Sequence, residues 1–123
     1  MSFDVFLQRF GPGEANSETL LAILKPHLVD SARGFDLRFD DGDAAIYGLN
    51  DLGSGFMVNH ITGKEAWDLL VAVAGQGGMA ILPVGCPAVV TSEDRLADLP
   101  DGLREDARVV HTGADLVRLI ESA

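Results

Sequence analysis

The chain has 123 residues, 47% of them hydrophobic, and a formal net charge of −10 at pH 7. These values predict one folded domain over residues 1–123, because the apolar content suits a single core and a second core would be too small to stand alone. The acidic balance argues against nucleic acid and anionic membrane as partners, since both are bound through Lys and Arg.

The first predicted element is a strand over residues 2–10, where side chains alternate between two faces. Phe3, Val5 and Leu7 share one face. Phe6 and Phe10 fall on the other, so we expect that second face to be partly covered too. Gly11-Pro12-Gly13 ends the strand.

A helix is predicted next, because Leu20, Ile23, Leu24 and Leu28 recur at spacings of three and four. Asn16 or Ser17 is the expected N-cap. Pro26 removes a backbone donor and should kink the helix or end it near Lys25. Gly34 closes the segment.

Residues 35–61 predict a three-stranded meander. Phe35, Leu37 and Phe39 alternate with charged residues, and Asp41-Gly42 favours a type I′ hairpin turn to a partner strand over residues 44–49. After a glycine-rich turn, residues 56–61 form the third strand, with His60 expected on the same face as Phe56 and Val58.

The second long helix is predicted over residues 62–75. Thr62 and Glu65 have the spacing of a capping box, and Trp67 is expected at the edge of the apolar stripe. Residues 79–84 are continuously apolar, which is typical of a strand covered on both faces.

The tail is predicted to hold short elements: a strand at 88–90, a helix from Thr91 or Ser92 to Leu99, a helical turn at 101–107, a strand at 109–110 and a last helix capped by Thr112. The order β-α-β-β-β-α-β plus this tail predicts a two-layer α+β sandwich, with helices on one face of a mixed or mainly antiparallel sheet. An exposed edge of that sheet would also permit a homodimer.

Cys86 is the first candidate for chemistry. It lies between Gly85 and Pro87, after the most buried predicted strand, and loops at strand ends often carry catalytic groups. A neighbouring His could activate the thiol as a nucleophile. The alternative is a packed, unreactive thiol, because free Cys is among the most buried residue types.

His60 and His111 are the candidate bases, since each stands between a predicted strand and a helix start. The explanation that the sequence favours for each is a strand-end histidine bonded to backbone or water. A ligand pocket between helix and sheet, using Trp67 and Asn59 near His60, is a weaker alternative.

No metal site or cofactor is predicted. The three His residues and the single Cys lack zinc spacing. Asp40, Asp41 and Asp43 surround a glycine, but their spacing differs from that of an EF-hand loop, and a hairpin turn explains them.

The compartment is inferred from features that the sequence lacks. No apolar run approaches the roughly 20 residues that span a bilayer, and the first residues show no pattern of a secretory signal. Cys86 is the only cysteine, so it cannot form an internal disulfide. We therefore expect a cytoplasmic address.

The opening residues 1–8, Met-Ser-Phe-Asp-Val-Phe-Leu-Gln, resemble the start of small bacterial proteins of uncharacterised function. Residues 56–60 and 82–86 resemble some of the same proteins. The resemblance implies no activity and assigns no role to any residue. In size and acidity the chain is also similar to immunity proteins that neutralise basic toxins.

The sequence supports two functional hypotheses. The first is a non-enzymatic acidic domain, immunity-like or regulatory, that binds a cationic protein and associates quickly because of its charge. The second is a small cysteine-dependent enzyme or redox protein that uses Cys86 with His60 or His111. The absence of a complete catalytic set in the sequence favours the first.

Overall fold

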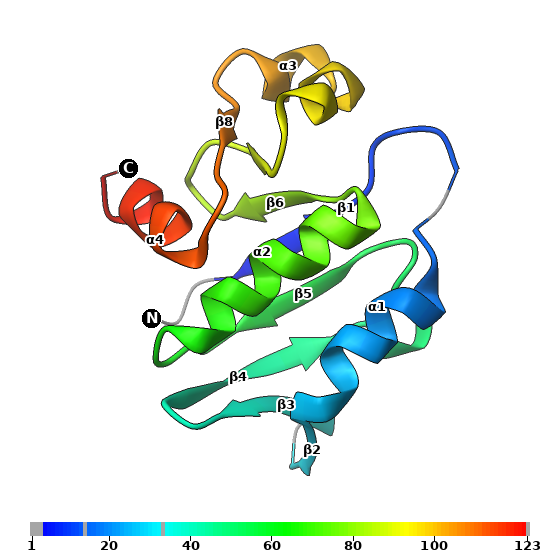
Figure 1. Ribbon diagram of the computed structural model, residues 1–123, viewed down its shortest axis with the longest axis vertical. Helices are drawn as coiled ribbons and strands as arrows, with labels where there is room; N and C mark the ends of the chain where they lie inside the picture. The colour runs from blue at the N-terminus through cyan, green and yellow to red at the C-terminus, as the bar shows by residue number, and fades with distance from the viewer. Residues whose placement is uncertain (1–3, 14, 33, 123) are drawn as a thin grey trace.

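The computed structural model describes residues 4–13, 15–32 and 34–122 (Figure 1). Within them, eight strands form one sheet in the order β2-β3-β4-β5-β1-β6-β7-β8. Every neighbouring pair is antiparallel except β7 and β8, which are parallel. The predicted α+β class is confirmed.

The strands are β1 (Val5–Gln8), β2 (Leu28–Ser31), β3 (Gly34–Phe39), β4 (Gly42–Tyr47), β5 (Phe56–Asn59), β6 (Ala80–Pro83), β7 (Val89–Val90) and β8 (Arg108–Val109). The helices are α1 (Ser17–Leu24), α2 (Glu65–Gly77), α3 (Asp101–Arg104) and α4 (Gly113–Ser122), with 3₁₀ turns η1 (Lys25–His27), η2 (Leu49–Asp51) and η3 (Glu93–Asp98).

The main core lies between the sheet and three helices. In Figure 1, α1 and α2 lie in front of the sheet, and α2 contacts both α1 and α4. Leu20 from α1, Leu70 from α2 and Leu116 from α4 are fully buried with Val5 and Val58 of the sheet. This layer is the one expected from the apolar stripes of the helices.

A second apolar cluster covers the opposite face at β6 and β7. It contains Ala80 and Val90, whose neighbours Ile81 and Val89 belong to the main core. Leu99, with Leu96 and Leu103 beside it, brings the segment from η3 to α3 onto this face. The long helices α1, α2 and α4 thus pack on one face as expected, the η3–α3 segment adds cover on the other, and β6 is covered on both faces as predicted.

The first helix begins and ends where the sequence indicates. The Asn16 side chain accepts hydrogen bonds from the backbone N–H groups of Glu18 and Thr19, and Pro26 converts the end of α1 into η1. The chain then enters β2, a strand that the sequence pattern did not predict. Part of the first strand's expected range, including Phe3, lies outside the described residues.

The β3–β4 hairpin differs from the predicted type I′ turn. Phe39 pairs with Gly42, so Asp40 and Asp41 occupy the turn, and His60 is the only non-glycine residue with positive φ in the described chain. Type I′ geometry needs positive φ at both turn positions. Glycine is required at position 42 because of close packing, since a Cβ there would lie 2.2 Å from the Thr62 carbonyl oxygen.

The predicted Thr62 cap of the second helix is also wrong. Helix α2 starts at Glu65, and the Asp41 carboxylate accepts hydrogen bonds from the backbone N–H groups of Lys64 and Glu65. Thr62 instead uses its hydroxyl to accept from the backbone N–H of Asp43. A carboxylate from the hairpin thus replaces the local cap.

Across the described ranges, no helix is both long and apolar enough to cross a membrane.

Candidate interaction surface

The strands at the centre of the sheet carry a row of large side chains on the face opposite α1 and α2. Tyr47 of β4 pairs with Met57 of β5, Met57 pairs with Phe6 of β1, and Phe6 pairs with Leu82 of β6. Residues paired in register project to the same face of a sheet. These four residues, which we call the apolar row, therefore cross four neighbouring strands.

Part of the apolar row is accessible. Phe6 is 41% exposed, whereas its neighbour Leu7, on the core face, is 1% exposed. Tyr47 and Met57 are half-buried, and Leu82 packs against the second cluster. The second face of the first strand is partly covered, as expected, because Phe10 joins the second cluster whereas Phe6 stays exposed.

Acidic side chains share this face with the apolar row. Strand alternation places Asp4, Asp36 and Asp43 on it, together with one base, Arg38. Asn59, predicted as a binding residue, lies here too, and its amide donates a 3.1 Å hydrogen bond to the Asp4 carboxylate. The surface is therefore apolar at its centre and predominantly negative around it.

A groove of about 360 Å³ lies at the β4–β5 end of the apolar row. Its lining includes Phe6, Tyr47 and Met57, and the exposed Asp51 of η2. Gly48 and Gly55 also line it, with backbone alone. We call this depression the end groove.

The three residues of the predicted thiol site lie in separate connections, after β5, β6 and β8. Cys86 is half-buried against the main core, and its backbone N–H donates to the Pro83 carbonyl. Among the described residues, no hydrogen bond joins its thiol to His60 or to His111. His60 lies just past β5, exposed and in the left-handed region with φ of 53°, rather than on the face of Val58.

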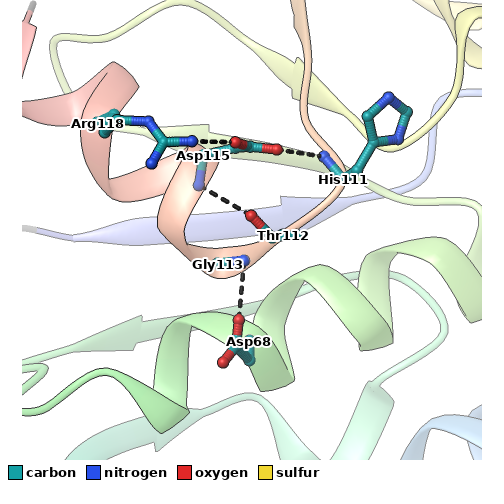
Figure 2. A network of polar contacts seen from close by, with 6 residues as sticks. All are labelled: Asp68, His111, Thr112, Gly113, Asp115 and Arg118. Atoms are coloured by element: carbon teal, nitrogen blue, oxygen red, sulfur yellow. Dashed lines mark hydrogen bonds and ion pairs between the residues drawn. The ribbon is translucent and has the colours of Figure 1, made fainter.

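His111 contributes its backbone, not its ring, to the contacts at the start of α4. Its N–H donates to the Asp115 carboxylate, and Figure 2 shows the imidazole pointing away from the network. That hydrogen bond, with smaller contributions from the Arg118 charge and the Thr112 hydroxyl, lowers the pKa of Asp115 below 3.8. The ring is exposed and is used by no contact in this network.

The same network attaches α4 to α2. The Gly113 backbone N–H donates a 2.9 Å hydrogen bond to Asp68 of α2, and the Thr112 hydroxyl accepts from the Asp115 N–H (Figure 2). A side chain at position 113 would collide with the backbone of Asp68. The predicted Thr112 cap is confirmed, and its role here is structural.

Trp67 is 4% exposed and belongs to the main core rather than to the edge of the helix stripe. Asn59, the polar residue expected beside it, is hydrogen-bonded to Asp4. Within the described ranges, no three His, Cys, Asp or Glu side chains are placed to hold a metal ion.

The apolar row is the feature that sequence reasoning missed. Phe6 breaks the alternation of its strand, and that was its one local signal. The row itself depends on strand register, which brings together residues from four separate segments.

Comparison of the chain with known protein families, curated proteins and solved structures found no match.

Proposed function

We propose that this protein is a non-enzymatic interaction domain that binds a cationic protein partner through the apolar row. The observation that supports this most directly is the exposure of Phe6, in register with the half-buried Tyr47 and Met57. Contiguous exposed apolar surface with a polar surround is typical of protein–protein contact sites.

The composition of this surface suits a partner with both apolar and basic side chains. Aromatic residues and methionine are enriched in the cores of interfaces, and burying apolar area stabilises a complex by about 25 cal/mol per Å² before the costs of association. Asp4, Asp36 and Asp43 around the row, and a net charge of −10, attract a positively charged surface. Such attraction mainly raises the association rate and sets specificity.

An immunity-like or regulatory role fits a domain that works by occupying the basic surface of another protein. We place this encounter in the cytoplasm, because the single cysteine offers no internal disulfide. In this proposal Cys86 packs against the core and takes no part in chemistry. Cys86→Ser is therefore expected to bind the partner as the wild type does, whereas a thiol enzyme would lose its activity.

The test is a selection of displayed random peptides on the immobilised protein. We expect enriched peptides to combine Lys or Arg with aromatic or aliphatic residues. Their binding should weaken in high salt and should fall strongly for Phe6→Ser and Met57→Ser. Leu21→Ser is the matched control, because Leu21 is 40% exposed on α1, away from the apolar row.

Two results would contradict the proposal. One is peptides that bind Phe6→Ser and Met57→Ser as tightly as the wild type, since they would use another surface. The other is enrichment of acidic or uncharged peptides whose binding ignores salt, which would remove the electrostatic part of the proposal.

A further inference from the structure

We infer that the end groove receives a single arginine side chain of the partner, with its guanidinium group against Asp51 and its flat face on the rings of Phe6 and Tyr47. The inference rests on the proposed function and specifies the chemistry that the partner must present. It assigns to Asp51 the role of selecting a cation at one end of the apolar row.

The size of the end groove suits a side chain better than a whole small molecule. Its volume of about 360 Å³ is near the lower end of ligand pockets, which run from roughly 300 to 1,000 Å³. It is a depression continuous with the apolar row, since Phe6, Tyr47 and Met57 belong to both. A partner lying along the row would therefore place one of its side chains in the groove.

Two positions that line the end groove are restricted to glycine. Gly55 has φ of 139° and Gly48 has φ of 98°, both in the region that L side chains rarely adopt. A Cβ on Gly55 would lie 2.9 Å from the Leu7 carbonyl oxygen. Glycine is thus required at both positions, so the lining between β1 and β5 is formed partly by bare backbone.

The charge of the end groove selects a cation. Asp51 is the only charged residue among the described residues that line it, and Gln8 and Ser54 add uncharged polar groups. An anionic ligand would meet the Asp51 carboxylate and the net negative charge of the chain. A purely apolar side chain would leave Asp51 without a partner in a drier environment, which costs free energy.

Arginine satisfies both parts of the lining. Its planar guanidinium stacks on aromatic rings and pairs with a carboxylate through two parallel hydrogen bonds. Lysine offers a strongly hydrated point charge and no flat surface. Arginine is also enriched at the residues that dominate binding energy in interfaces.

The experiment titrates the isotope-labelled full chain with capped Gly-Gly-Xaa-Gly-Gly peptides, where Xaa is arginine, lysine or citrulline, and measures backbone amide chemical shifts. We expect the arginine peptide to shift Gly48, Asp51 and Gly55 in a saturable way. Citrulline keeps the shape of arginine without its charge, and it should bind about tenfold more weakly or worse, with lysine in between.

Two variants of equal charge separate a local contact from the general field of the protein. Asp51→Asn should weaken binding of the arginine peptide by about as much as replacing its arginine with citrulline does. Asp94→Asn, in η3 and exposed, changes the net charge equally and should leave the affinity within about twofold at physiological salt, where distant charges are screened.

The inference is overturned if citrulline binds as well as arginine, if Asp94→Asn weakens binding as much as Asp51→Asn, or if the shifts lie elsewhere or do not appear. None of these results removes the proposed function, which the displayed-peptide selection tests through Phe6 and Met57. The proposed function alone would be contradicted if the displayed peptides ignored the apolar row while the arginine peptide still bound at Asp51.

Discussion

The Asp41 carboxylate oxygen Oδ2 lies 2.7 Å from the backbone nitrogen of Lys64, so the hairpin turn between β3 and β4 caps the start of α2. Glu65 completes a reciprocal arrangement, because its carboxylate accepts a 3.1 Å hydrogen bond from the Asp40 backbone N–H. The contacts resemble a capping box whose two halves come from different segments. They join the hairpin to the helix layer.

Removing this cap should destabilise the fold. We expect Asp41→Ala to lower the free energy of unfolding by about 0.5–2 kcal/mol, the usual cost of losing an N-cap carboxylate. Urea denaturation checks the value. Asp40→Ala is the matched control, because Asp40 contributes its backbone N–H to the cap; equal losses in the two variants would contradict the role given to Asp41.

Gly42 should tolerate no side chain. Gly42→Ala places a Cβ against the backbone of Thr62, so either the hairpin or the start of α2 must shift, at an expected cost of about 1–3 kcal/mol. Gly102→Ala is the control, since nothing lies within 4 Å of its Cβ and it is in helix α3. Thermal denaturation should show the control unchanged or slightly more stable.

Phe6 and Leu7 are adjacent in sequence, but substitution of Leu7 should mainly lower stability and substitution of Phe6 should mainly lower peptide binding. Leu7→Ala removes a buried side chain and should cost about 2–5 kcal/mol of stability. Phe6→Ser removes an exposed ring and should cost less than about 1 kcal/mol while abolishing peptide binding. Chemical denaturation of both variants, with binding measured in parallel, checks this; a large stability loss for Phe6→Ser would mean that Phe6 is structural.

The stability that Asp115 contributes at the start of α4 should decrease in acid. Because the pKa of Asp115 is lowered in the folded state, its charged form stabilises the fold above pH 3.8, and this contribution is lost as the pH falls through the folded value. The stability difference between wild type and Asp115→Asn should therefore shrink on acidification. Urea unfolding as a function of pH measures it.

Glu121→Gln provides the control for that experiment, since it removes one negative charge from an exposed position on the same helix. Its stability difference from wild type should change less with pH. A difference for Asp115→Asn that stays constant from neutral to acidic pH would contradict the proposed contribution of the His111 hydrogen bond.

Local patterns predicted the elements whose causes are local. The Asn16 cap, the end of α1 just before Pro26, the Thr112 cap and the two-sided burial of β6 all depend on residues within a few positions of each other. The α+β class came from the order of these elements. Such features need only hydrophobic periodicity and capping preferences.

The remaining features depend on contacts between distant segments. Thr62 has the spacing of an N-cap. The Asp41 carboxylate instead accepts the hydrogen bond at the helix start, and the Thr62 hydroxyl bonds to Asp43. The apolar row required the register of four strands. Strand β2 was missed because Leu28 continued the helical spacing, while pairing with Leu37 of β3 placed it in the sheet.

The position of β1 between β5 and β6 has a consequence for how the chain reaches this structure during synthesis. Val5 pairs with both Val58 and Pro83, so residues made early must wait for two much later segments before the middle of the sheet closes. The β2–β5 strands pair with near neighbours in the sequence and need no such delay. Contacts over long sequence separations slow folding, and the nascent β1 segment would carry Phe6 and Leu7 unpaired until its partners have emerged from the ribosome.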